Sequence, residues 1–278
     1  MQDARVWTPP GGVLGVILAQ TRGRVTTLRA RASELRERAS SAAEVPSLAA
    51  AIGAARGRLA LIAEVKRRSP SRGSINPELD AVQQALDYEG GGAAAISVLT
   101  EKEHFGGSIE DLVRIAASVN IPTLRKDFCI DSLQLLEARA CGAAAMLLIA
   151  RALHPDKLVE LAASANEVGL ETLVEVRNEQ ELELALLLGT TLIGVNNRNL
   201  ETLEITPDVS QRLIPLIPQS HSAVFESGIR SRADVELAAT AGADAVLVGS
   251  ALSAPTRDVR EFVRSFTTVP GHGRALRD

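Results

Sequence analysis

One unit repeats along most of this chain, and it limits the fold more than any other feature. A short apolar run, of the kind that forms a buried strand, is followed by a stretch in which apolar residues have helical spacing. Eight such runs occur, at residues 61–65, 94–99, 121–124, 144–149, 172–176, 192–195, 223–225 and 245–248. Strands that are apolar on both faces indicate a parallel sheet covered by helices. The repeat therefore predicts an α/β fold, a (β/α)8 TIM barrel. A doubly wound open sheet is the alternative, because strand count alone does not prove closure.

Capping residues and glycines mark the helix boundaries within the repeat. Helix starts are expected at Asn76-Pro77, Ser108 with Asp111, Asp131, Thr206-Pro207 and Ser231 with Asp234. Glycines such as Gly142 and Gly242 stand just before apolar runs, where a left-handed residue commonly ends a helix. These signals place a helix after each strand and turn the chain back into the sheet.

An arginine-rich helical segment precedes the first strand. Its apolar residues recur at helical spacing over residues 12–39, and a short second helix is expected at residues 47–55. We expect one structural domain, in which an N-terminal helical extension at residues 1–56 packs on a barrel at residues 57–268. Residues 269–278 contain Pro270 and two glycines and are expected to form a loose tail.

Composition argues against several classes of partner. The net charge of −4 argues against bulk nucleic-acid affinity. The leading arginines leave nucleic-acid binding open as an alternative, but no aromatic residues are interleaved with them. The apolar run at residues 13–19 is too short to span a membrane and has the wrong flanks for a secretion signal. We expect neither a nucleic-acid nor a membrane partner.

Cysteine and motif content bear on compartment and cofactors. The two cysteines, Cys129 and Cys141, lack CxxC spacing, which favours a reducing, cytoplasmic compartment. No His, Cys or Asp cluster has metal-ligand spacing, and the nucleotide-binding patterns GxGxxG and GxxxxGK[ST] do not occur. We expect a reaction that uses no metal and no cofactor.

Ionisable residues follow several strands at the end where the catalytic groups of such barrels gather. Glu64 and Lys66 lie two residues apart and so share one face of the first strand. Lys126 follows the third strand and Glu175 ends the fifth, so in a closed barrel all four side chains can enter one cavity. Neighbouring carboxylates favour the charged form of a buried lysine, which can then act as a general acid. A purely structural network of ion pairs is the alternative.

Small residues follow the last two strands. Ser227-Gly228 and Gly249-Ser250 allow backbone N–H groups to approach a ligand closely. Barrels that act on phosphorylated substrates hold the phosphate at this place, so these turns predict a phosphate site. The alternative is that the glycines only make tight turns.

Several of these segments together resemble one family, the indole-3-glycerol-phosphate synthases of tryptophan biosynthesis. The matching segments are residues 62–71, 97–100, 105–108, 124–128, 173–176, 193–200, 226–229 and 247–252. They occur in family order across nearly the whole chain. The resemblance implies a carboxy-lyase that converts 1-(2-carboxyphenylamino)-1-deoxyribulose 5-phosphate to indole-3-glycerol phosphate, carbon dioxide and water. It also makes other enzymes of the pathway candidate partners.

The resemblance also implies a role for each site residue. Lys126 would be the general acid for ring closure, Glu175 and Lys66 would assist loss of the carboxylate and of water, and Glu64 would hold Lys66. The substrate would be positioned by Ser69, Asn196, Arg198 and Glu226. Its phosphate would be bound by Ser227, Gly228, Gly249 and Ser250, and its anthranilate ring would be packed by Phe105, Phe128 and Leu147.

Two departures from the family pattern and two rival functions remain. Phe225 stands where a small residue is usual, which predicts crowding inside the seventh strand. Residues 19–21 lack the family's usual lysine and acidic residues, which leaves the contacts of the extension open. The rivals are another phosphosugar barrel, such as phosphoribosylanthranilate isomerase, and a phosphate-ligand barrel without catalysis.

Overall fold

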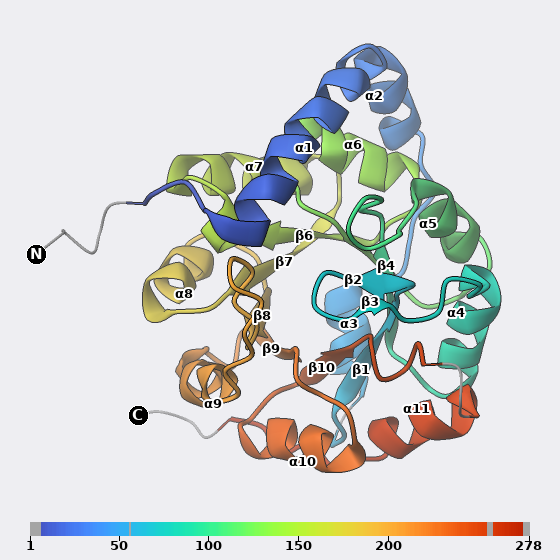
Figure 1. Ribbon diagram of the computed structural model, residues 1–278, viewed down its shortest axis with the longest axis vertical. Helices are drawn as coiled ribbons and strands as arrows, with labels where there is room; N and C mark the ends of the chain where they lie inside the picture. Colours follow the sequence, from blue (N-terminus) through green and yellow to red (C-terminus); the bar gives the residue numbers. More distant parts are fainter. Residues whose placement is uncertain (1–6, 56, 255–257, 275–278) are drawn as a thin grey trace, which may run out of the picture.

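Parallel strands close into a barrel in the computed structural model, which describes residues 7–55, 57–254 and 258–274. The barrel strands are β1 (Ala60–Val65), β4 (Ala95–Leu99), β5 (Thr123–Lys126), β6 (Ala145–Ile149), β7 (Glu171–Val176), β8 (Leu192–Asn196), β9 (Ser222–Glu226) and β10 (Ala245–Val248). Each strand pairs in parallel with its neighbours in chain order, and β1 pairs with both β4 and β10 (Figure 1). The predicted (β/α)8 barrel is confirmed, and an open sheet is ruled out.

A helix follows each barrel strand and covers the outside of the barrel. These helices are α4 (Ala81–Gly90), α5 (Ile109–Ala116), α6 (Ser132–Ala140), α7 (Pro155–Glu167), α8 (Glu179–Leu186), α9 (Asp208–Leu213), α10 (Arg232–Thr240) and α11 (Val259–Thr267). Two 3-10 turns, η1 (Ala150–Ala152) and η2 (Ile214–Leu216), extend two of the loops. The hydrophobic core lies between this ring of helices and the strands.

Most of the predicted helix starts are confirmed. Ser108, Asp131 and Ser231 cap their helices through side-chain oxygens, and α9 begins directly after Pro207. The start predicted at Asn76-Pro77 is wrong, because α4 begins after Asp80. The loop before it instead forms a small hairpin of β2 (Arg68–Ser69) and β3 (Gly73–Ser74).

Successive side chains of each barrel strand point alternately into the barrel and out toward the helices. Glu226 ends β9 and lines the interior cavity, so Phe225, its neighbour, points outward toward the helices. Phe225 is buried there, and the predicted crowding of the inner layer is therefore wrong. Strand β5 runs two residues further than predicted, through Arg125 and Lys126, because these residues pair with Val98 and Leu99 of β4.

The N-terminal helices cover both ends of the barrel. A single helix was expected over residues 12–39, but α1 (Gly12–Arg29) and α2 (Ala32–Ser40) are separated by a turn, and α2 packs on α6. Helix α1 contributes Val13 and Ile17 to the wall of the cavity at the carboxyl end of the strands. The short predicted helix is α3 (Leu48–Gly53), which is tied to the start of β7 by hydrogen bonds from Ser47 Oγ and Leu48 N to Glu171. Residues 1–6 and 56 of the expected extension lie outside the described residues.

The C-terminal residues 269–274 are bound to the barrel, so the expectation of a loose tail is wrong for this part. Val269 is buried, and its carbonyl accepts a hydrogen bond from Leu59 N at 3.0 Å. Arg274 forms an ion pair with Asp244 at 2.5 Å. Residues 275–278 of the expected tail lie outside the described residues. No helix in the described part of the chain is long and apolar enough to cross a membrane.

Candidate active site

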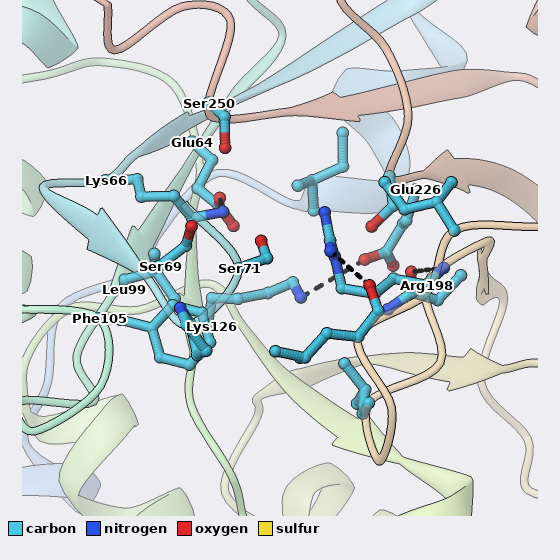
Figure 2. Close-up of a pocket in the computed structure, with 18 of the residues that line it drawn as sticks. Glu64, Lys66, Ser69, Ser71, Leu99, Phe105, Lys126, Arg198, Glu226 and Ser250 are labelled. Carbon is cyan, nitrogen blue, oxygen red and sulfur yellow. Dashed lines mark hydrogen bonds and ion pairs between the residues drawn. The ribbon is translucent and has the colours of Figure 1, made fainter. Parts of the chain in front are cut away.

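A cavity of about 390 Å³ opens at the carboxyl ends of the barrel strands, within the size range of small-molecule sites (Figure 2). Every residue that the sequence suggested for the site lines it. They are Glu64, Lys66, Ser69, Phe105, Lys126, Phe128, Leu147, Glu175, Asn196, Arg198, Glu226, Ser227, Gly228, Gly249 and Ser250. The structure thus brings these residues together, and their individual roles stay predictions.

Lys126 lies between two carboxyl groups. Its Nζ is 3.4 Å from Glu175 Oε2 and 3.4 Å from Glu226 Oε2. Burial alone would lower the pKa of Lys126, but Glu226, Glu175 and Glu64 outweigh it and raise this pKa above the usual value. Lys126 is therefore an ammonium at neutral pH, and it can donate a proton to a group in the cavity.

Glu226 is the carboxyl group that is least well paired. The pKa of Glu226 is raised to about 8. Burial is the main cause, the charges of Glu175 and Glu64 add to it, and the Lys126 charge offsets it only in part. Its Oε1 is buried and has no hydrogen-bond partner among the described residues. That oxygen occupies space that a Cβ on Gly194 would fill. Glycine at position 194 is therefore required for the Glu226 carboxyl to lie inside the barrel.

Lys66 and Glu64 form a second ion pair, as their spacing on β1 predicted. The Glu64 carboxylate lies where a Cβ on Gly249 would be, so this glycine makes room for the pair. Lys66 Nζ is also 6.0 Å from the centre of the Phe105 ring, at the outer limit of a cation–π contact. Figure 2 shows Lys66 and Lys126 entering the cavity from one side, with Glu226 on the other.

Aromatic and aliphatic side chains form one wall of the cavity. The rings of Phe105 and Phe128 are 6.1 Å apart between centres and tilted by 39°. Leu147 from β6, and Val13 and Ile17 of α1, also line the cavity. Sequence reasoning missed the two α1 residues, because helical spacing shows that a face is buried but not what it is buried against.

The turns after β9 and β10 also line the cavity, with Ser227, Gly228, Gly249 and Ser250. Ser227 and Gly228 both have left-handed backbones, with φ of 66° and 97°. Arg72 and Arg230 also line the cavity, and sequence reasoning did not select them. Burial and the neighbouring charge of Arg72 lower the pKa of Arg198. Arginine side chains together with N–H groups that have no backbone acceptor among the described residues suit an anionic ligand.

A charged cluster around Asp127, which also lines the cavity, supports the Lys126 strand, and sequence reasoning missed it as well. The buried Asp127 carboxylate accepts hydrogen bonds from both guanidinium nitrogens of Arg24, at 3.1 and 3.0 Å, from Thr100 Oγ1 at 2.7 Å and from Phe128 N at 2.8 Å. Arg125 lies 3.3 Å away. Burial would raise the pKa of Asp127, but the Arg125 and Arg24 charges outweigh it and lower this pKa. Two charged residues flanking Lys126 on an apolar strand were the signal that could have revealed the cluster.

In the part of the chain that the structure describes, no three His, Cys, Asp or Glu side chains are grouped so that they could hold a metal ion. The ionisable groups of the cavity are instead paired with one another, as lysine with glutamate. The arrangement supplies ammonium groups, carboxyl groups and an anion-binding turn around one space. Such a set can protonate a carbonyl, accept or return a proton, and bind a phosphorylated molecule.

Comparison with known proteins gives one consistent result. A family model for indole-3-glycerol phosphate synthase matches residues 14–266. Proteins of that name include one from Parafrankia sp. (strain EAN1pec), 48% identical over 77% of this chain and 80% of its own length. Others come from Nocardioides sp. (strain ATCC BAA-499 / JS614), 52% identical over 69% and 74%, and Streptomyces griseus subsp. griseus, 46% identical over 80% and 82%.

Solved structures resemble the chain in fold alone. One, described as native KDPGal, is 16% identical with a TM-score of 0.53, covering 75% of this chain and 92% of that one. Thiamine phosphate pyrophosphorylase from Pyrococcus furiosus is 18% identical with a TM-score of 0.53, covering 75% and 93%. Identities this low carry no information on the reaction.

Proposed function

Because this chain belongs to the indole-3-glycerol phosphate synthase family, we propose that the cavity at the carboxyl ends of its strands is the active site for that reaction. The reaction converts 1-(2-carboxyphenylamino)-1-deoxyribulose 5-phosphate into indole-3-glycerol phosphate, carbon dioxide and water in tryptophan biosynthesis. The chain is a carboxy-lyase. The observation that carries the site assignment is the position of the Lys126 ammonium, between two carboxyl groups in a cavity that also holds an anion-binding turn.

Ring closure needs an acid at the ribulose carbonyl. When the ring carbon that bears the carboxylate attacks the carbonyl carbon, negative charge develops on the carbonyl oxygen. Lys126 would donate its proton to that oxygen, and the surrounding carboxyl groups keep it protonated until then. The apolar wall of Phe105, Phe128 and Leu147 would hold the anthranilate ring against the carbonyl.

Loss of carbon dioxide and of water completes the indole. Departure of the carboxylate leaves its electron pair in the ring system. The hydroxyl formed from the carbonyl oxygen then leaves as water with one added proton, and the ring carbon next to nitrogen loses a proton to complete the double bond. Glu175 and Lys66 would move the protons in these steps, and Glu64 would hold Lys66 in place through their ion pair. Both lysines can interact with the leaving groups, because both line the same cavity.

The remaining residues would bind the substrate. Ser69, Asn196, Arg198 and Glu226 would position its carboxylate and its hydroxyl groups. Ser227, Gly228, Gly249 and Ser250 would bind the phosphate, since all four line the cavity and the N–H groups of the left-handed Ser227-Gly228 turn have no backbone acceptor among the described residues. Arg72 and Arg230 add positive charge to the cavity lining.

We also propose the setting in which the enzyme works. The extension at residues 1–56 and the barrel at residues 57–268 would act as one structural domain, because α1 supplies part of the cavity wall. The protein would be cytoplasmic, without metal, cofactor, membrane or nucleic-acid partners, and other tryptophan-pathway enzymes are candidate partners. Retention of the protein on immobilised nucleic acid, lost as the salt concentration rises, would contradict the absence of a nucleic-acid partner.

An assay of the purified protein tests the proposal. The indole ring of the product is fluorescent. An increase in indole fluorescence together with stoichiometric release of carbon dioxide would therefore support the assignment. An isomerase would rearrange its substrate without releasing carbon dioxide, and a ligand-binding barrel would give no turnover. Either of those results would contradict it.

A further inference from the structure

Asn197 follows Asn196 at the end of β8, but its side chain is used differently. Asn196 lines the cavity, whereas Asn197 does not and is buried to 1% exposure. The Asn197 amide nitrogen donates hydrogen bonds to the carbonyl oxygens of Glu226 at 3.2 Å and Ser227 at 3.1 Å. Its amide oxygen accepts one from Ser210 N at 2.9 Å. Every strong hydrogen-bonding group of this side chain therefore binds backbone.

These two carbonyl groups belong to the peptide units that form the anion-binding turn. In a trans peptide the C=O and N–H bonds point in opposite directions. A side chain that binds the carbonyls of Glu226 and Ser227 from outside the cavity therefore directs the N–H groups of Ser227 and Gly228 toward the cavity. Neither N–H has a backbone acceptor in the described part of the chain.

The turn also has a backbone conformation that needs support. Ser227 has a φ of 66°, which is unfavourable for a residue with a Cβ, and Gly228 follows with a φ of 97°. The hydrogen bonds from Asn197 hold the carbonyls on either side of the Ser227 Cα. The Glu226 carbonyl also accepts a hydrogen bond from Asn197 N at 3.1 Å, which a change of side chain would keep, whereas the Ser227 carbonyl is bound by the side chain. Loss of the side-chain bonds would let the Ser227 backbone relax toward a negative φ and turn the Gly228 N–H away from the cavity.

We propose that Asn197 is a positioning residue for substrate phosphate. It does not touch the substrate, and it acts by orienting the Ser227 and Gly228 N–H groups that bind the phosphate oxygens. This inference rests on the proposed function, in which that turn is the phosphate site.

The sharpest test is Asn197→Asp, which keeps the shape of the side chain. One carboxylate oxygen still accepts from Ser210 N, but the other replaces the NH2 group and repels the two carbonyl oxygens. We expect the inhibition constant for inorganic phosphate, measured in competition with substrate, to rise roughly tenfold or more. We expect KM for the substrate to rise with it, while kcat changes less.

Asn199→Asp is the matched control. Asn199 uses its amide oxygen to accept hydrogen bonds from Glu201 N at 2.8 Å and Thr202 N at 3.3 Å, and an aspartate oxygen can do the same. It adds the same charge two residues away and should leave the phosphate inhibition constant within about twofold of the parent value.

Asn197→Ala is the second variant, and it decides the test if circular dichroism shows that Asn197→Asp does not fold. It removes both donors without adding charge and should also raise the phosphate inhibition constant. Folded variants at position 197 that keep the parental phosphate inhibition constant and KM would overturn the inference. A failure of phosphate to compete with substrate in the parent enzyme would overturn it at an earlier point, by refuting the phosphate site itself.

Discussion

Three glutamates and two lysines are paired with one another in the cavity, and these five groups do not balance in charge. Glu64, Glu175 and Glu226 face two lysines, Lys66 and Lys126. One excess carboxylate in a buried site is unfavourable, so one carboxyl group holds its proton. Glu226 is that group, because it is buried, has one oxygen without a partner among the described residues and has a raised pKa. The negative charge of a bound substrate therefore has to be balanced by this proton and by the arginines that line the cavity, Arg72, Arg198 and Arg230.

The Glu226 proton predicts how stability varies with pH. The pKa of Glu226 rises from 4.5 to about 8 on folding, so between these pH values the folded protein binds more protons at this site than the unfolded chain. The free energy of unfolding therefore falls as the pH rises through this window. Glu226→Gln removes the titration, so its stability relative to the parent should increase from pH 5 to pH 9 by about 1 kcal/mol or more.

Urea unfolding at several pH values measures this difference. Glu204→Gln, the same change at an exposed position, is the control and should give a profile parallel to that of the parent. A parallel profile for Glu226→Gln as well would show that the Glu226 carboxyl is ionised across the whole range, and the proton would then have to be placed elsewhere.

Lys126 should be essential for turnover but not for phosphate binding. Lys126→Met keeps an unbranched side chain that is one atom shorter and removes the ammonium group, so we expect indole formation to fall by roughly 100-fold or more. The phosphate inhibition constant should change little, because the phosphate turn belongs to β9 and β10. Lys102→Met, on an exposed loop, should behave like the parent enzyme. Near-normal turnover of Lys126→Met would remove this lysine from the mechanism.

At the scale of whole elements, the sequence was sufficient where local signals were strong. Apolar runs located the strands, and oxygen-bearing caps such as Ser108 and Asp131 located helix starts. The break after Arg29 has no glycine or proline to mark it, and it follows from packing of α2 on α6. Such packing links residues far apart in the chain, so local patterns do not reveal it.

The distinction between local and distant contacts also explains which site residues could be predicted. Strand-end residues such as Glu64 and Glu175 are placed by alternation and by the rule that barrel sites lie at strand ends. Asn197 and Asp127 act through neighbouring backbone or through a distant helix, and their contacts appear only when the chain is folded. The prediction that Phe225 crowds the barrel interior was wrong because the sequence alone did not show which face of β9 this side chain occupies.

Helix α1 is an element whose position should affect substrate affinity. Arg24 binds Asp127 in bidentate fashion near one end, and Gly11 N and Val13 N bind Glu201 at the other. Arg24→Met should loosen the helix and raise KM roughly threefold to tenfold, since α1 supplies part of the cavity wall. Asp127 would remain paired with Arg125, so the barrel should stay folded.

Steady-state kinetics with a thermal melt measure the effect. Arg22→Met is the control, because Arg22 lies on the same helix and its side chain has no hydrogen bond or ion pair within the described residues. An unchanged KM for Arg24→Met would show that the Arg24 contact is not needed to hold the wall.

At the scale of the whole molecule, barrel closure is what creates the site. Lys66, Lys126, Glu175 and Glu226 are far apart in the sequence and come from strands β1 to β9, yet they meet in one cavity because β1 pairs with β10. The two ends of the chain strengthen this closure, since α3 is tied to β7 and residues 269–271 bond to residues 57–59. Function therefore depends on a closed barrel rather than on any single loop.

The most direct test of this convergence is a crystal structure of the enzyme with indole-3-glycerol phosphate bound. We predict that the phosphate lies on the N–H groups after β9 and β10, and the indole between Phe105, Phe128 and Leu147. Lys126 Nζ and Glu175 should both be within hydrogen-bond distance of reacting groups. Product bound with its phosphate elsewhere, or with Lys126 and Glu175 out of contact, would contradict the convergence of these groups on one substrate.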